Sequence, residues 1–237
     1  MANTIALRKQ YSTLLDEVYK LSSLTAVLDG PNELVKEGAN ANEILIPKLS
    51  MQGLADYNKS TGYVPGDVTL DYETKKCAYD RGRMFNVDAM DNIESAGIAF
   101  GRLSSEFLRT QVVPELDAYR LASYAQIPGV TTVKAALATG KEALAALRTA
   151  RGKIENAEAN LSTCYLFINP TVYGMIEDLD TTASKKAIEG FAGIIKVPSG
   201  RFYDKVKLNA SGAGGFTKDT GAVAMNFLIV DKQAAIQ

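Results

Sequence analysis

The longest helical pattern of apolar and polar residues along the chain covers residues 88–125. Its apolar positions recur at steps of three and four on one face, which we expect to be buried against flanking strands; they are Ile93, Ala96, Phe100, Leu103 and Phe107. Acidic residues gather at its start, where unpaired N–H groups and the helix dipole favour carboxylates. Pro114 removes a helix hydrogen bond, so the pattern predicts a long spine helix that kinks or restarts there.

Just before this helix the pattern changes to a period of two. Val68, Leu70 and Tyr72 alternate with polar residues, and the alternation resumes over 77–87 after a polar, turn-like stretch at 73–76. The sequence therefore predicts a long hairpin with a charged tip. A two-stranded ribbon is marginal in water by itself, so we expect this one to contact a partner molecule. The contacting residues would be Val68, Leu70, Tyr72, Lys75, Lys76, Tyr79, Arg81 and Arg83.

The residues before the hairpin predict an extended arm. An apolar stripe at helical spacing indicates a short amphipathic helix over 6–21, whereas 25–41 is rich in turn-forming residues. Residues 43–49 have the character of a strand, which Pro47 confines to a sheet edge or a strand end.

After the spine helix, the sequence Ile127-Pro128-Gly129 breaks the chain, and a compact α/β unit is predicted. In chain order the pattern favours a helix at 141–155, a buried central strand at 164–168, a helix at 171–179 capped by Asn169 and Pro170, a strand at 193–197, a glycine-rich loop at 211–221 and a strand at 223–230. Together with the arm and hairpin, these elements predict an α+β fold.

The amino-acid composition excludes several kinds of chemistry but says little about the fold. The 26 basic and 27 acidic residues leave a formal net charge of −1, so no global field indicates nucleic-acid binding. The chain has no histidine, which excludes histidine-based triads and imidazole metal ligands but leaves open an enzyme built on lysine, tyrosine and carboxylates. Cys77 and Cys164 lack metal-type spacing, and we expect both to be reduced. No apolar run approaches the ~20 residues that span a bilayer, so no membrane partner is expected.

None of the candidate motifs contains all the residues that its chemistry requires. Gly140-Lys141 lacks both the earlier glycine of a phosphate loop, where Ala135 stands, and the hydroxyl residue after the lysine, where Glu142 stands; a helix start explains it better. The glycine run at 212–215 lacks the flanking strand and helix of a dinucleotide site. Acidic groups at 88–94 and 177–180 are explained by helix capping and a solvated helix end. We therefore expect no catalytic site, no cofactor and no metal.

Four strings carry a resemblance to a known family. They are GLADY at 53–57, DRGRMFNVD at 80–88 followed by Asp91, PELDAYR at 114–120 and VPSGRFY at 197–203. Similar strings occur in the same order in the major capsid proteins of tailed bacteriophages, and the chain resembles this group over almost its whole length. The resemblance implies the HK97-type capsid fold.

The resemblance also implies a domain organisation and a function. Residues 1–51 would form the N-terminal arm, 52–87 the extended hairpin called the E-loop, 88–129 the spine helix of the peripheral domain, and 130–237 the axial domain with a return towards the peripheral domain. Such proteins are structural and not enzymes. They self-assemble into pentamers and hexamers of an icosahedral shell that encloses packaged DNA without sequence-specific binding.

The partners implied by the resemblance are further copies of the chain, a portal protein and a scaffolding protein. The mature location would be the virion, after assembly in the cytoplasm of the bacterial host. Because only 1–51 precede the hairpin, we expect the scaffold to be a separate chain if Met1 is the native start. Family members usually continue past the last strand with further β segments that return to the peripheral domain. This sequence ends at Gln237, so a truncated chain and a naturally shortened form both fit, and the completeness of the peripheral sheet stays open. Covalent crosslinking through Lys75 or Lys76 is not carried over, because no acceptor asparagine is identified.

Two other functions stay open at this point. A bacterial encapsulin-type compartment shell would share the fold and enclose cargo enzymes instead of DNA. A small α/β enzyme that uses the loop at 211–221 as a lid belongs to a different class, and the empty motif search counts against it.

Overall fold

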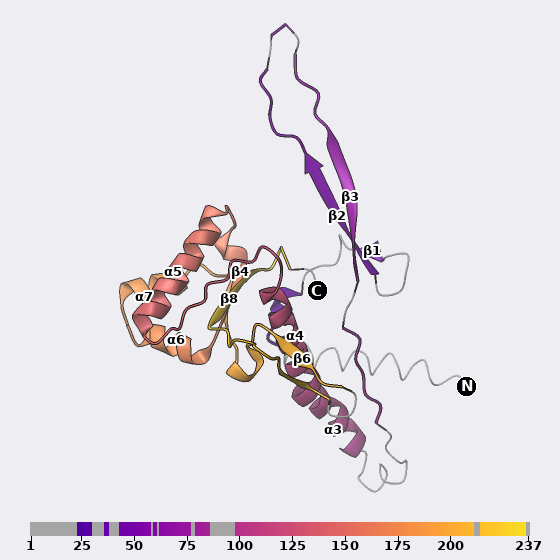
Figure 1. The fold of residues 1–237 in the computed structure, drawn as a ribbon, viewed down its shortest axis with the longest axis vertical. Helices are drawn as coiled ribbons and strands as arrows, with labels where there is room; N and C mark the ends of the chain where they lie inside the picture. Colours follow the sequence, from indigo (N-terminus) through magenta and orange to yellow (C-terminus); the bar gives the residue numbers. More distant parts are fainter. Residues whose placement is uncertain are drawn as a thin grey trace, which may run out of the picture. The chain divides into compact units, whose positions relative to one another are not determined.

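The computed structural model describes residues 23–29, 36–37, 43–57, 59–60, 62–76, 79–85, 98–210 and 214–235 (Figure 1). The chain divides into two compact units. Unit 1 consists of Met1–Gly30 and Val87–Gln237, and unit 2 is the intervening segment Pro31–Asn86. The predicted α+β class is confirmed. The predicted helix at 6–21 lies outside the described residues, as do Ile93 and Cys77.

A three-stranded sheet forms the centre of unit 1. Its middle strand is β4 (Cys164–Ile168), with β5 (Gly193–Lys196) parallel to it on one side and β8 (Phe227–Asp231) antiparallel on the other. The prediction of a buried central strand is confirmed, because Leu166, Phe167 and Ile168 are all fully buried. The β4–β5 connection passes through two helices, as a parallel pair requires.

Helices α5 (Gly140–Asn156), α6 (Pro170–Glu177) and α7 (Thr182–Ile188) lie on one side of this sheet (Figure 1). The buried side chains of this layer are Ala143, Leu147, Leu166, Ile168, Val172, Ile176 and Ala187. The predicted helix start at Gly140-Lys141 is confirmed, since Thr139 and Glu142 form a capping box. Asn169 accepts a hydrogen bond from the Thr171 amide and so caps α6 as predicted.

The spine helix runs on the other side of the sheet (Figure 1). It consists of α3 (Ile98–Phe107), the π-helical segment η3 (Leu108–Val112) and α4 (Val113–Ala125). The predicted irregularity at Pro114 is confirmed, because the wider π-helical turn comes directly before this residue, which has no N–H to donate. Residues 86–97 are outside the described part, and so is the side chain of Phe100.

The predicted burial of the spine's first face is only partly correct. Among the spine side chains that the structure describes, Leu103 and Phe107 are half-buried, whereas the fully buried positions come later, in α4. A second core forms there between α4 and the sheet, and its buried residues are Leu28, Leu121, Phe167, Val197 and Phe202. The helix therefore packs mainly through the part that follows Pro114.

Short elements complete the second layer. They are η1 (Ala26–Leu28), η5 (Ser199–Arg201) and the antiparallel pair β6 (Val206–Leu208) and β7 (Phe216–Lys218), whereas η4 (Leu161–Thr163) contacts α5. The prediction of an unstructured loop at 211–221 is wrong in part, because β7 lies inside it. The predicted strand at 223–230 begins only at Phe227, after an isolated bridge between Tyr203 and Ala224.

The structure of unit 2 contains a hairpin, but its strands differ from the predicted ones. Its strands are β1 (Lys36–Glu37), β2 (Glu43–Met51) and β3 (Val68–Lys76), in the order β1-β2-β3 and antiparallel throughout. The hairpin is formed by β2 with β3, and residues 73–76 continue the strand where a turn was predicted. Residues 79–85 contain neither helix nor strand. The connection at the tip is 52–67, so Lys75 and Lys76 lie at the opposite end of the ribbon.

The register of the two strands shows how β2 is matched to β3 as its partner. Glu43 faces Lys76 at one end and Met51 faces Val68 at the other, and two ion pairs, Lys48–Glu73 and Lys76–Glu43, join the strands. Pro47 fits the prediction of an edge position, because β1 pairs only with Ile44 and Leu45. At Pro47, β2 has β3 as its single neighbour in the described sheet.

Candidate functional site

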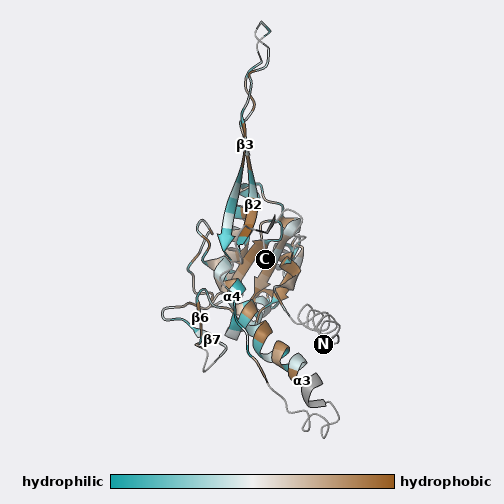
Figure 2. Ribbon diagram, turned by 90° about the vertical axis from the view of Figure 1, so that its right-hand side faces the viewer, coloured by the Kyte–Doolittle hydropathy of each residue, from teal (hydrophilic) through white to brown (hydrophobic). Residues whose placement is uncertain are grey.

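The β2–β3 ribbon has two chemically different faces. Residues directly opposite each other in an antiparallel pair point to the same side, and successive residues alternate sides. The register therefore puts the pairs Pro47–Tyr72, Leu49–Leu70 and Met51–Val68 on one side, which we call the apolar ribbon face. The other side carries Ile44, Ile46, Lys48 and Ser50 of β2 and Thr69, Asp71, Glu73 and Lys75 of β3, so it is polar mainly towards the tip; we call it the polar side. Figure 2 shows hydrophobic and hydrophilic residues along both strands.

The apolar ribbon face is exposed. Leu49, Met51, Val68, Leu70 and Tyr72 each keep between 49% and 67% of their surface accessible. Soluble monomers rarely expose contiguous apolar patches, and those that do usually use them as interaction sites. A row of large, exposed apolar side chains on a two-stranded ribbon is therefore typical of an interaction surface.

Ion pairs connect charged side chains on the polar side of the ribbon. Glu73 binds Lys48 at 2.8 Å through one carboxylate oxygen and Lys75 through the other. These hydrogen bonds, first that of Lys48 and then that of Lys75, lower the pKa of Glu73 to about 2. The same pairing raises the pKa of Lys48. The three charged groups thus satisfy one another within the ribbon.

Apolar exposure continues into the connection at the tip. Gln52 and Asp67 hold its root through the Gln52 amide, which donates to the Asp67 carbonyl at 3.3 Å. Tyr57 and Tyr63 pack ring to ring with centroids 5.0 Å apart, and Leu54 is fully exposed. The tip therefore extends the surface available to a partner.

The structure brings together only some of the predicted contact residues. Val68, Leu70 and Tyr72 lie on the apolar ribbon face, whereas Lys75 is on the polar side and Lys76 pairs with Glu43 at 3.7 Å. Tyr79, Arg81 and Arg83 lie in 79–85, outside the paired strands. Leu49 and Met51 were missed, although the strand that contains Leu49 was predicted, because its partner strand was misassigned.

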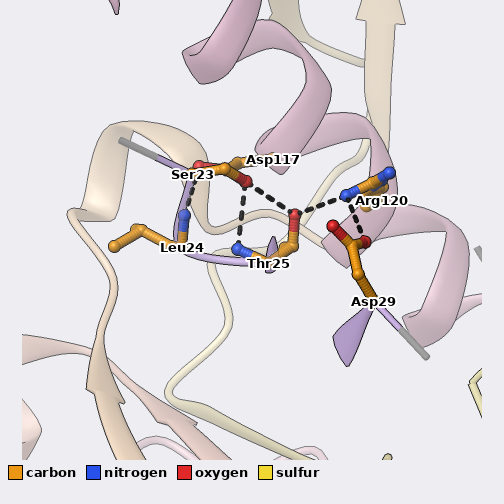
Figure 3. Close-up of polar contacts among 6 residues, drawn as sticks. All are labelled: Ser23, Leu24, Thr25, Asp29, Asp117 and Arg120. Atoms are coloured by element: carbon orange, nitrogen blue, oxygen red, sulfur yellow. Dashed lines mark hydrogen bonds and ion pairs between the residues drawn. The ribbon is translucent and has the colours of Figure 1, made fainter. Parts of the chain in front are cut away.

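A second polar feature, on unit 1, was not predicted at all. Asp117 of α4 is fully buried and accepts four hydrogen bonds from residues 23–25 (Figure 3). Oδ1 accepts from the Ser23 hydroxyl at 2.7 Å, the Thr25 hydroxyl at 2.7 Å and the Thr25 amide at 3.2 Å. Oδ2 accepts from the Leu24 amide at 3.0 Å. Partners separated by 92 to 94 positions leave no local signal in the sequence.

Arginines complete this Asp117 cluster. Arg120 donates to the Thr25 hydroxyl at 3.2 Å and lies 3.5 Å from Asp29 (Figure 3). Arg201 is 3.7 Å from the second oxygen of Asp117, so the carboxylate also has a cation nearby. Buried charges in proteins are normally paired and hydrogen-bonded in this way. The hydrogen-bonding and charge requirements of Asp117 are thus met, and the cluster has a structural role: it holds residues 23–25 on α4.

Other glycine and cysteine positions of unit 1 have structural explanations. A Cβ at Gly140 would collide with the Met175 carbonyl, so close packing of α5 on α6 accounts for this glycine. Cys164 is a free, buried thiol whose pKa is raised, first by burial and then by Asp231. Among the residues that the structure describes, no cluster of acidic or cysteine side chains could hold a metal ion. Within the same residues no helix is long and apolar enough to cross a membrane.

Comparison of the chain with family models, curated proteins and solved structures found no match. The function must therefore be inferred from the sequence strings and from the geometry described above. The feature with the clearest functional meaning is the apolar ribbon face, because burial inside its own unit does not account for it.

Proposed function

We propose that the chain is the structural subunit of an icosahedral shell, the major capsid protein of a tailed bacteriophage with the HK97-type fold. The observation that carries the proposal is the exposed apolar ribbon face on unit 2. The four family-like strings support it, as does the order of elements: a ribbon, a long helix interrupted near Pro114 and an α/β unit.

The occupant of the apolar ribbon face is a second copy of the chain. A shell of identical subunits requires each copy to offer one surface and to receive another, which is a heterologous contact that closes by symmetry. Burial of the exposed half of a leucine, valine or methionine side chain contributes about 1 kcal/mol. Leu49, Met51, Val68 and Leu70 together would therefore stabilise such a contact by a few kcal/mol, repeated around every capsomer.

The wider biology follows as part of the proposal. Copies assemble into pentamers and hexamers in the cytoplasm of the bacterial host, with a separate scaffolding protein and a portal protein as partners. The finished virion shell encloses DNA without reading its sequence, which agrees with the near-neutral formal charge of the chain. No enzymatic step and no cofactor belong to this role.

The test is a pair of substitutions at neighbouring residues on opposite ribbon faces. Leu70→Lys places a charge on the apolar ribbon face, where burial of an unpaired ammonium costs several kcal/mol. Thr69→Lys adds the same charge on the polar side. We expect wild type and Thr69→Lys to form closed shells or capsomers by negative-stain microscopy and sedimentation, and Leu70→Lys to remain a folded monomer.

The proposal is contradicted if the wild-type chain stays monomeric both when it is expressed alone and when the genes that neighbour its own gene are co-expressed. Equal assembly of Leu70→Lys and wild type would show that the ribbon face is not the contact. Nucleic acid inside purified shells supports the capsid role, whereas an enclosed enzyme would indicate the encapsulin-type compartment instead.

A further inference from the structure

The two outer edges of the β2–β3 ribbon differ in how they are protected. On the outer edge of β2, β1 pairs with Ile44 and Leu45, and Pro47 further along has no N–H to donate to a new strand. β3 is the last strand of the described sheet, and it contains neither proline nor glycine. An edge strand without such protection is a template for pairing with another strand. The outer edge of β3 is therefore the side of the ribbon on which a further strand can add.

Charge is distributed unevenly along this edge. In the half nearer the root, Glu73, Lys75 and Lys76 are held in ion pairs within the ribbon. In the half nearer the tip, 68–72, Asp71 is the single charged residue. All five residues of this half are exposed, so it offers extended and accessible backbone with little charge.

The sequence of 68–72 favours pairing with a second copy of itself. Two copies that pair antiparallel through the same edge are related by a two-fold axis normal to the sheet, which keeps like faces on the same side. An axis at Leu70 would place Leu70 opposite Leu70 and Val68 opposite Tyr72, on the apolar ribbon face. On the polar side it would place Thr69 opposite Asp71, whose carboxylate accepts hydrogen bonds from hydroxyl groups. Apolar pairs and hydrogen-bonding pairs of this kind stabilise antiparallel strands.

Neighbouring registers would bring like charges together. An axis at residue 71 or 73 would put Asp71 or Glu73 opposite its own copy, and an axis at 72 would put these two carboxylates opposite each other. An axis at 69 would put Asp67 opposite Asp71. With the axis at Leu70, Asp67 meets only Glu73, at the end of the paired stretch, and ion pairs within the ribbon already neutralise that carboxylate. An axis at Thr74 avoids like charges as well, but it leaves Leu70 outside the paired stretch.

We propose that the outer edge of β3 pairs antiparallel with β3 of a second copy, about a two-fold axis at Leu70, so that one sheet runs across both copies. The two apolar ribbon faces then join into one continuous apolar surface. This contact uses the edge of the ribbon, whereas the proposed shell contact uses its face, so the pairing does not depend on the shell function.

The experiment is disulfide crosslinking of full-length chains that carry one engineered cysteine, in a Cys77→Ser background that leaves only the buried Cys164. The Leu70→Cys substitution lies on the proposed axis, where directly opposite residues are about 4.5–5.5 Å apart, within reach of a disulfide. Leu49→Cys is the matched control, because Leu49 is opposite Leu70 on the same face and is comparably exposed, at 59% against 54%. In the paired sheet, two copies of residue 49 would be separated by three strand spacings of about 4.8 Å, too far for a disulfide.

We expect oxidised glutathione to convert Leu70→Cys into a disulfide-linked dimer on non-reducing gels, and Leu49→Cys and Thr74→Cys to stay monomeric. Thr69→Asp places a second carboxylate opposite Asp71, so it should lower the crosslinked fraction of Leu70→Cys about threefold. Thr69→Lys places a cation there and should raise this fraction.

Three results would overturn the pairing. Equal crosslinking at residues 49 and 70 would indicate stacked ribbon faces, crosslinking at 74 in place of 70 would indicate the other register, and no crosslinking at 70 would exclude the contact. Closed shells without a crosslink at 70 therefore overturn the pairing and leave the shell function standing. A crosslink at 70 in a chain that forms no shell, alone or with its neighbouring genes, supports the pairing and overturns the shell function.

Discussion

Leu28→Ala tests whether the N-terminal segment is an integral part of the folded unit 1. Leu28 is fully buried and packs with Leu121, Phe167, Val197 and Phe202 in the core between α4 and the sheet. Replacement of a buried leucine by alanine removes apolar contacts and leaves a cavity, which typically costs about 3–5 kcal/mol. An isolated segment on the surface would instead change the free energy of unfolding by about 0.5 kcal/mol or less.

The assay is urea unfolding followed by circular dichroism at the helical band. The helices α3 to α7 all belong to unit 1, so the signal reports this unit. Leu54→Ala is the matched control, because the same substitution is made at a fully exposed position in unit 2. A loss below about 1 kcal/mol for Leu28→Ala would refute the packing of residues 23–29 into this core.

Two further predictions concern packing and charge. Gly140→Ala should lower the melting temperature, since its Cβ meets the Met175 carbonyl and overpacking costs about 1–3 kcal/mol, whereas Gly152→Ala in the same helix has open space and should raise it slightly. The pKa of Glu73 is depressed from 4.5 to about 2, so its contribution to the ribbon is complete above pH 4.5 and is lost as the pH falls towards 2. Carboxyl chemical shifts should show this titration; a midpoint for Glu73 near 4.5, unchanged in Lys48→Met, would contradict the ion pairs.

Local signals predicted the elements of the α/β unit well. The helix start at Gly140-Lys141, the Asn169 cap and the continuous apolar run of β4 are encoded in neighbouring residues, and all three predictions are confirmed. Helix α7 was missed because its sequence, TASKKAI, is short and polar, with little more than Ala187 buried. Its start is set by a capping box at Thr181 and Ser184, which a hydrophobic pattern does not detect.

Non-local pairing explains the larger errors. The alternation in 68–72 predicted a strand correctly but did not specify its partner, and the nearest following alternation was chosen in place of β2. The turn formers of the true tip, among them Gly62 and Pro65, precede β3 and do not follow it. The Asp117 cluster is non-local in the same sense, because the carboxylate and its donors are distant in sequence and become neighbours only when α4 packs on residues 23–25.

Charged residues of the two strands oppose a change in the register that gathers the large apolar side chains on one face of the ribbon. A shift of one residue in strand register moves every side chain of that strand to the opposite face, so a slipped β3 would place Asp71 and Glu73 beside Leu49. Isolated ribbons are prone to such shifts, since little else specifies their pairing. Glu73 binds Lys48 across the strands, and Lys76 binds Glu43 at the end of the ribbon, so a slip would break both ion pairs. Exposed ion pairs add little to stability, but two of them placed across one ladder discriminate against the wrong register. On this reasoning, Glu73→Gln and Lys76→Met should leave the fold of unit 1 unchanged and impair assembly together more than either does alone.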